Sequence, residues 1–180
     1  SLEVRTHTPL KFSGLENLIH LGSFFTSTRI VDSPNFSKLK NLVMIAATHS
    51  SLQRISGLEK LEKLIYVHVS AVKPSFLNRL PSNVQSLFVR NAVPENADFA
   101  RFPNLTHFSI SDCAAIDISK LIGNCDNVVT MDIAGVRRIL NMSMFEKAFP
   151  RVRRIAMVPE TIEQFEELKS HVSNETDIRM

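Results

Sequence analysis

His107, Ser109 and Asp132 are the three side-chain types that hydrolases combine for nucleophilic catalysis. Each occupies an outward position in one of two successive predicted strands, so we expect the three to lie near one another. Nucleophilic catalysis also requires an oxyanion hole, usually built from backbone N–H groups at a tight turn. The sequence has no G-x-S-x-G motif and only five glycines. We therefore expect a protein without catalytic activity.

Histidine and cysteine, the commonest zinc ligands, are too widely separated here to form a metal site. His20, His68 and His107 fall on the first, third and fifth predicted strands. Alternate strands lie about 9–10 Å apart, whereas zinc–nitrogen bonds are about 2.1 Å long. Cys113 and Cys125 lack further ligands at zinc-binding spacing, and buried core positions suit them better. The sequence therefore predicts no metal and no other cofactor.

The strands that carry these residues recur along the chain. An apolar residue is followed three positions later by a second one, and two positions after that by an apolar or small residue. This pattern begins seven times, at intervals of 20 to 24 residues. The seven segments are LIHLGS from Leu18, LVMIAA from Leu42, LIYVHV from Leu64, VQSLFV from Val84, LTHFSI from Leu105, VVTMDI from Val128 and VRRIAM from Val152. The pattern predicts about seven parallel strands, with return segments packed behind them.

The return segments are expected to supply the hydrophobic core behind the strands. After Asp117, apolar residues at 118, 121, 122 and 125 have helical spacing, which predicts a helix with Asp117 as its N-cap. The residues predicted to be buried behind the strands are Ile30, Phe36, Leu52, Ile55, Leu58, Leu77, Leu80, Phe99, Phe102, Leu121, Ile139, Met142, Phe145 and Phe149.

The two ends of the sequence differ. Residues 159–173 predict a C-terminal capping helix, with Thr161 and Gln164 at capping-box spacing. Its apolar stripe, expected to face the last strand, consists of Ile162, Phe165, Leu168 and Val172. At the other end, Leu2 and Val4 alternate like the end of a further strand. We therefore expect residues 1–180 to form a single domain that is a monomeric fragment of a longer chain.

This pattern resembles the leucine-rich-repeat family from Leu15 to Val172. One unit resembles the cysteine-containing repeat of F-box/leucine-rich-repeat proteins, through Leu105, Phe108, Ile110, Cys113, Ile116, Asp117 and Cys125. The resemblance implies an α/β solenoid, a horseshoe that captures a protein on its concave strand face. It further implies a substrate-recognition domain of a cullin-based ubiquitin ligase receptor.

Strand alternation assigns the side chains of the concave face. The predicted partner-binding residues are His20, Met44, Tyr66, His68, Phe88, Arg90, His107, Ser109, Thr130, Asp132 and Arg154. An exposed Tyr66 beside Met44 and Phe88 has the composition of a binding hot spot. The sequence therefore predicts a protein partner on this face.

An RNA-associated or scaffold domain is the alternative. Five arginines lie near the last strands: Arg137, Arg138, Arg151, Arg153 and Arg154. Guanidinium groups match phosphate and carboxylate geometry, although the net charge of +3 is small and Tyr66 is the only tyrosine. No apolar run is long enough to span a membrane. With two cysteines in the chain, we expect an intracellular protein, cytoplasmic or nuclear.

Overall fold

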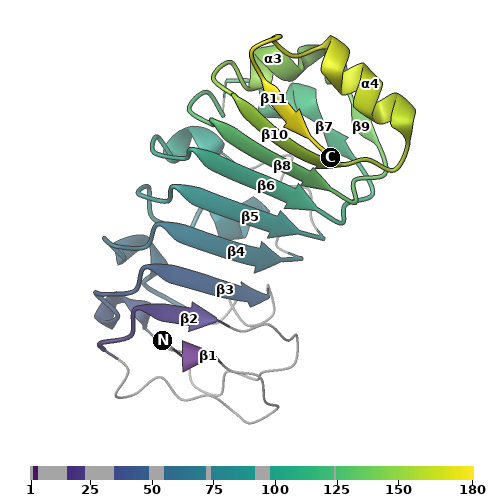
Figure 1. Ribbon diagram of the computed structural model, residues 1–180. Coiled ribbons are helices and arrows are strands. Elements are labelled where there is room, and N and C mark those ends of the chain that lie inside the picture. Colours follow the sequence, from purple (N-terminus) through teal and green to yellow (C-terminus); the bar gives the residue numbers. More distant parts are fainter. Residues whose placement is uncertain are drawn as a thin grey trace.

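The computed structural model describes residues 2–3, 16–22, 35–48, 55–71, 74–91, 98–123 and 125–180. Within these ranges the fold is α/β, and its main element is a nine-stranded sheet (Figure 1). The strands are β1 (Leu2–Glu3), β2 (His20–Gly22), β3 (Met44–Thr48), β4 (Tyr66–Ser70), β5 (Ser86–Arg90), β6 (His107–Ser111), β8 (Thr130–Ala134), β10 (Arg154–Val158) and β11 (Asp177–Arg179). Every neighbouring pair is parallel, and neighbours in this sheet follow in chain order.

The seven predicted strands are confirmed as β2, β3, β4, β5, β6, β8 and β10. Each begins two residues after its predicted apolar anchor, as His107 does after Leu105. The strands β6 and β8 are parallel neighbours, with His107 opposite Thr130. Parallel strands need a crossover of a dozen or more residues, and the spacing of 20 to 24 residues provides it.

One face of the sheet is buried and the other is open. In β4, Val67 and Val69 are fully buried, whereas Tyr66 and His68 are partly exposed. The same alternation holds in β5, β6, β8 and β10. We call the side that carries the first and third residues of each strand the open face.

The return segments are single helical turns. They are η1 (Phe36–Lys38), η2 (Leu58–Lys60), α2 (Pro74–Leu77), η3 (Phe99–Arg101), η4 (Ile118–Leu121), η5 (Met142–Met144) and α3 (Phe145–Ala148). A second, two-stranded parallel sheet pairs β7 (Ile116–Asp117) with β9 (Ile139–Leu140) beside η4 and η5. The strand pattern of the sequence does not predict this small sheet.

The helix predicted after Asp117 is shorter than expected. Asp117 does cap the turn, since its carboxylate accepts a hydrogen bond from the Ser119 N–H at 3.0 Å. However, η4 is a 3-10 turn that ends at Leu121, because Ile122 is extended and Gly123 has a φ of +74°. Leu121 and Cys125 are nevertheless buried. The apolar residues with helical spacing are therefore buried without a full helix, since the 3-10 turn ends at Leu121.

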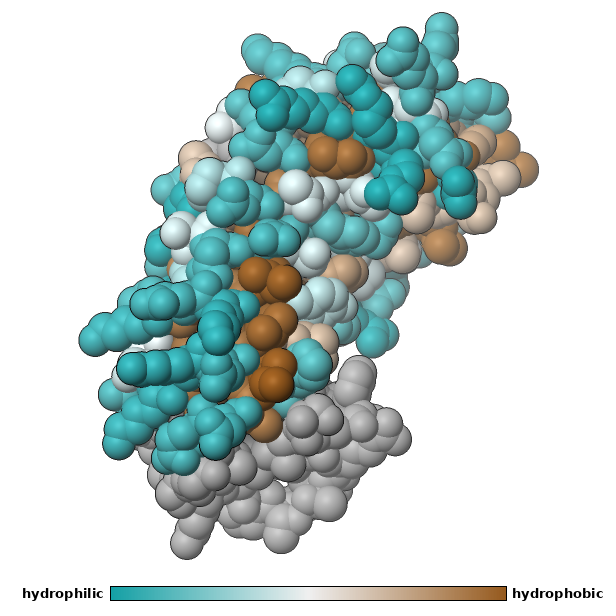
Figure 2. Space-filling model, turned by 60° about the vertical axis from the view of Figure 1, so that its left-hand side comes forward, coloured by the Kyte–Doolittle hydropathy of each residue, from teal (hydrophilic) through white to brown (hydrophobic). Residues whose placement is uncertain are grey.

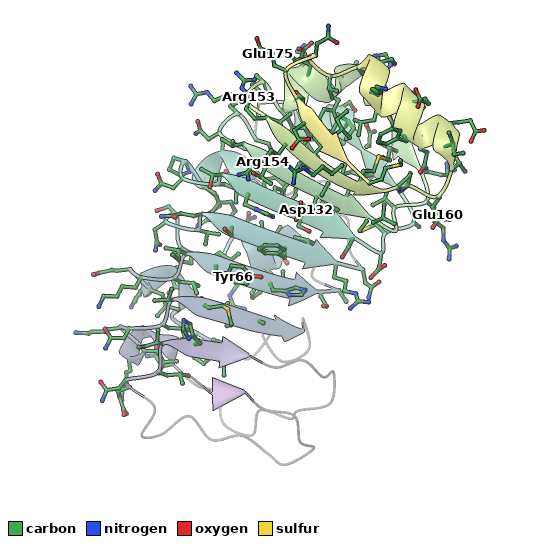
Figure 3. All side chains as sticks on the ribbon, in the orientation of Figure 1. Tyr66, Asp132, Arg153, Arg154, Glu160 and Glu175 are labelled. Carbon is green, nitrogen blue, oxygen red and sulfur yellow. The ribbon has the colours of Figure 1, made fainter. Side chains whose placement is uncertain are left out.

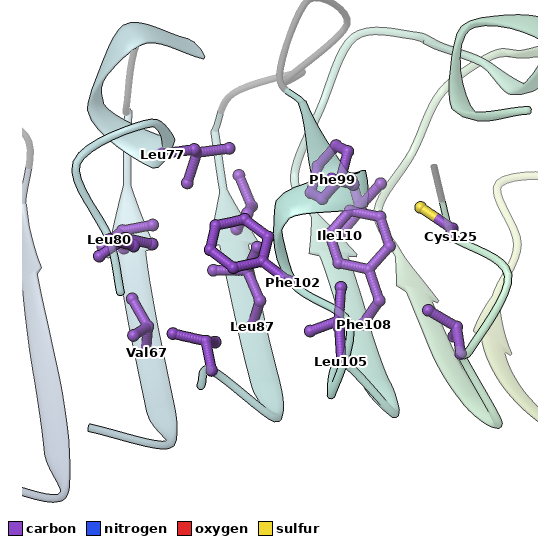
Figure 4. Packing of buried hydrophobic residues seen from close by; sticks show 14 of the residues in the cluster. Val67, Leu77, Leu80, Leu87, Phe99, Phe102, Leu105, Phe108, Ile110 and Cys125 are labelled. Atoms are coloured by element: carbon purple, nitrogen blue, oxygen red, sulfur yellow. The ribbon is translucent and has the colours of Figure 1, made fainter. Parts of the chain in front are cut away.

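The predicted core largely agrees with the structure. All of its described members are buried except Ile139, which is partly buried, while Ile30 and Leu52 lie outside the described residues. Figure 4 shows Phe99, Phe102 and Phe108 filling the space between strands and return segments. The ring centroids of Phe99 and Phe108 are 5.0 Å apart, within the range of favourable aromatic pairs.

The C-terminal helix is confirmed in part. The helix α4 (Ile162–Ser170) is shorter than residues 159–173, and the Thr161 hydroxyl accepts the Gln164 N–H. The Gln164 side chain accepts from the Glu160 N–H instead of from Thr161, so the capping box is incomplete. Ile162 is 76% exposed because it lies in the first turn, away from the core, and so does not join the buried stripe.

The array does not close with α4. After the helix the chain adds β11, whose Ile178 pairs with Ile155 of β10. This strand was missed because the position equivalent to the other anchors carries Glu175 in place of an apolar residue. The expectation that the helix ends the sheet is therefore wrong. At the other edge, Leu2 belongs to β1, while Val4 lies outside the described residues.

Candidate functional site

The strand register aligns the predicted partner-binding residues in columns on the open face. The first column contains His20, Met44, Tyr66, Ser86, His107, Thr130 and Arg154. The third residues form a parallel column that includes His68, Phe88, Ser109 and Asp132, and Arg90 is the fifth residue of β5. Figure 3 shows Tyr66, Asp132 and Arg154 along this face. The predicted placement of these residues is confirmed; their binding role remains a prediction.

Three rings from adjacent strands form what we call the aromatic row: Tyr66, Phe88 and His107. The Phe88 centroid lies 4.7 Å from that of Tyr66 and 4.8 Å from that of His107, with interplanar angles of 32° and 30°. His68 is close to the same ring, at 6.0 Å. Because Phe88 lies against it, Tyr66 is only partly exposed, and the prediction of an exposed tyrosine is wrong in this respect. The row has one apolar centre, Phe88.

Burial and charge keep this part of the face neutral. Burial raises the pKa of the Tyr66 hydroxyl above its usual value. Burial, and secondly the positive charge of Arg90, lower the pKa of the His68 imidazole. Both shifts favour the uncharged side chains at neutral pH. Tyr66, Phe88 and His68 therefore form an uncharged part of the open face.

The carboxylates on or beside the open face already contact a basic side chain. Asp132 Oδ2 lies 2.9 Å from His107 Nε2, and Asp112 Oδ2 accepts from Arg90 Nε at 2.6 Å. At the sheet edge, Asp177 pairs with Arg179 at 2.7 Å. These contacts leave Arg154 as an exposed charge of the first column that forms no ion pair with any described residue.

The hydrolase interpretation meets a geometric obstacle. Asp132 contacts Nε2 of His107, whereas in the Ser-His-Asp triad the carboxylate holds Nδ1 and leaves Nε2 for the serine. Ser109 also forms no hydrogen bond with His107 in the part of the chain that the structure describes. The two residues are two positions apart on one strand, which separates their attachment points by about 6.5 Å. This arrangement presents hydrogen-bonding groups on a surface and does not activate the serine.

Neither histidines nor cysteines gather into a metal site in the described ranges. His20, His68 and His107 lie on β2, β4 and β6, and no cluster of three or more ligand-type side chains occurs in this part of the chain. Cys113 and Cys125 are buried and form no disulfide. Burial, and secondly Asp126, raise the pKa of the Cys125 thiol to about 12, so it stays protonated.

The arginines that are neighbours in sequence divide into two groups in space. Arg137 and Arg138 follow the carboxyl end of β8, whereas Arg151 and Arg153 precede the amino end of β10. The two strands are parallel, and five strand residues extend about 16 Å, so the groups lie at opposite ends of the strands. Arg151 donates to Asn127 at 2.9 Å. The expected single cluster of five arginines is therefore wrong.

An apolar stripe beside the open face was not predicted from the sequence. Ile19 is 46% exposed, and Val43 and Ile65 are partly exposed, each immediately before its strand. Backbone hydrogen bonds join the three, from the Val43 N–H to the Ile19 carbonyl and from the Ile65 N–H to the Val43 carbonyl. Figure 2 shows hydrophobic side chains aligned on this side of the molecule. The signal was present, since each residue directly follows an anchor leucine.

Comparison of the chain with protein-family models, with curated proteins and with solved structures gave no match. Among the described residues, no helix has the length and hydropathy to cross a membrane. The function of the chain is therefore inferred from the geometry of its open face.

Proposed function

We propose that the chain is a leucine-rich-repeat solenoid, a horseshoe that acts as a non-catalytic protein-interaction module. Support comes from the parallel strands, which follow in chain order at 20 to 24 residues and alternate with short turns. Stacked units of this length bury a continuous core that no unit has alone. No described segment lies across the open face, which leaves its two columns available to a partner.

The aromatic row is the observation that carries this proposal. Tyr66 and Phe88 are partly exposed on a face whose other outward residues are mostly polar or small. Aromatic side chains in the centre of a surface, surrounded by polar groups, are typical of interaction hot spots. Tyr66 and Phe88 are uncharged at neutral pH, so burial of their surface can attract a partner in addition to charge.

The test compares captured proteins between variants of the whole chain. Proteins captured by the wild type should be lost with Phe88→Ala and with Tyr66→Ala. They should be retained with Leu140→Ala, which removes an apolar side chain, 38% exposed, away from the open face. Circular dichroism shows whether each variant is folded. Equal capture by all four proteins would exclude the open face as the binding surface.

A narrower proposal is a substrate receptor of a cullin-based ubiquitin ligase. It is supported by the unit that resembles the cysteine-containing repeat, in which Cys113 and Cys125 are buried and Asp117 caps a turn. Co-purification of the full-length protein with a cullin adaptor tests it. If the protein binds its partner but does not co-purify with the adaptor, the ligase proposal is excluded and only the interaction-module proposal stands.

RNA association through the arginines is the second candidate. The exposed Arg153 and Arg154 form no ion pair with a described residue, and this is the observation in its favour. Arg137 and Arg138 lie at the other end of the strands, so the five arginines do not form one compact basic patch, and this weakens it. A steep loss of RNA affinity with salt, removed by Arg153→Gln and Arg154→Gln together, would favour it.

A further inference from the structure

We propose that the open face binds an extended acidic peptide segment that crosses the strands. An apolar side chain of the segment packs on the aromatic row, and its carboxylates pair with Arg154, near which Arg153 adds a second positive charge. This inference rests on the proposed function and specifies the chemistry of the partner.

The distribution of charge on the open face indicates that the partner is negatively charged. Three carboxylates on or beside the face each contact a basic side chain: Asp132 contacts His107, Asp112 contacts Arg90 and Asp177 contacts Arg179. Arg154 is exposed and has no such partner in the described ranges. Arg153, the residue before the strand, is also exposed and adds positive charge nearby. An incoming carboxylate can therefore pair with the Arg154 guanidinium without displacing an existing ion pair.

The aromatic row determines the other end of the segment. Phe88 is flanked by Tyr66 at 4.7 Å and by His107 at 4.8 Å, so the three rings form one continuous surface with Phe88 at its centre. A side chain such as Leu or Phe loses water against three rings at once. The nearby guanidinium of Arg90 does not oppose this burial, because it is bonded to Asp112.

The strand register fixes the spacing between the two ends. From β5 to β10 there are three strand steps of 4.7–4.9 Å, about 14 Å, and from β4 to β10 there are four, about 19 Å. An extended segment advances about 3.3 Å per residue, so about four to six residues separate the apolar residue from the acidic one. The first-column residues between Tyr66 and Arg154 are Ser86, His107 and Thr130. The small Ser86 and Thr130 allow a peptide backbone to approach and offer it hydroxyl groups.

A nucleic acid fits the same surface less well. Bases bind proteins by stacking on open ring faces. The faces of Phe88 are directed toward Tyr66 and His107, with interplanar angles of only 32° and 30°, and therefore have little room for a base.

The test is a selection of twelve-residue peptides from a displayed random library on the 180-residue chain. Peptides selected in parallel on Phe88→Ala are sequenced for comparison. The expected consensus is an aromatic or aliphatic residue separated by about four to six positions from Asp or Glu. A labelled oligouridylate of twelve nucleotides is titrated in parallel as the nucleic-acid probe.

The selected peptide is then titrated against variants by fluorescence anisotropy. Arg153→Gln with Arg154→Gln should weaken binding about three- to tenfold, and added salt should reduce the difference. The matched control Arg138→Gln, an exposed arginine at the other end of the strands, should change nothing. Phe88→Ala should weaken binding about thirtyfold or more, and Tyr66→Ala provides a second variant if the first is unfolded.

The outcomes separate this inference from the proposed function. A consensus without acidic residues, which depends on Phe88 but not on Arg153 and Arg154, overturns the acidic partner and leaves the binding face in place. Peptides that bind equally to Phe88→Ala overturn both. The acidic-peptide inference is also overturned if no peptide is enriched, or if only the oligouridylate binds and does so through the arginines.

Discussion

The contact between Phe99 and Phe108 supports a quantitative prediction about stability. Both side chains are fully buried, at 1% and 0% exposure, and their ring centroids are 5.0 Å apart behind β6. Replacing a buried phenylalanine by alanine costs about 3–5 kcal/mol, a large part of the 5–15 kcal/mol that stabilises a typical domain. Phe108→Leu keeps most of the volume and removes the ring. We expect it to lower the free energy of unfolding by about 1–3 kcal/mol.

A double-mutant cycle isolates the ring contact. Phe99→Leu, Phe108→Leu and the double variant should give a coupling free energy of about 0.5–1.5 kcal/mol. Urea unfolding followed by circular dichroism is the assay, because the chain has no tryptophan and Tyr66 is its one tyrosine. Ile162→Ala, at a site 76% exposed, is the control and should change the free energy by less than about 0.5 kcal/mol. Additive effects of the two substitutions would refute the packing described behind β6.

Two further predictions concern the backbone and pH. Gly57 has a φ of +78°, and an added Cβ would lie 2.5 Å from Asn35 Oδ1 and 2.6 Å from the Ser37 nitrogen. Gly57→Ala should therefore lower the free energy of unfolding by about 1–3 kcal/mol, which is measured as a lower urea midpoint. Burial, and secondly Arg90, lower the pKa of His68 in the folded chain. On acidification the His68 imidazole therefore takes up a proton at a higher pH in the unfolded chain than in the folded chain. This contribution to stability is present above about pH 6.5, the usual imidazole pKa, and is lost as the pH falls through the folded value.

Each of these two predictions has a control. Gly123 has a similar φ of +74°, but an added Cβ there would contact nothing within 4 Å, so Gly123→Ala should cost less than Gly57→Ala. Equal costs would show that the close approach to Asn35 is unimportant. His68→Gln should reduce the loss of stability between pH 7.5 and 5.5. An unchanged pH dependence in this variant would mean that His68 does not contribute to it.

The strands were predictable from sequence because their signal is local. Each anchor, such as Leu105, is followed by alternating residues that must place one side in the core. The return segments were less predictable, since apolar residues with helical spacing can be buried without a full helix. The spacing of Leu121 and Cys125 predicts a helix through both residues, but the turn ends at Leu121, before the extended Ile122 and the positive φ of Gly123.

The candidate site was predictable in its membership and not in its contacts. Register places Tyr66, Phe88 and His107 on adjacent strands, which results from alternation alone. The stacking of the rings, and the pairing of Asp132 with His107, depend on side-chain conformations that a one-dimensional pattern does not contain. For the arginines the prediction of proximity itself was wrong. Arg137 and Arg153 are near one another in sequence but lie at opposite ends of parallel strands.

The order of the strands also determines how distances on the open face can change during evolution. Each strand of the main sheet pairs only with its predecessor and successor in that sheet. Loss or duplication of one unit of 20 to 24 residues would leave every other pair intact and move the aromatic row relative to Arg154 by one step, about 4.8 Å. If the proposed segment binds, the number of units between the two features sets the length of that segment, and the length changes only in whole units.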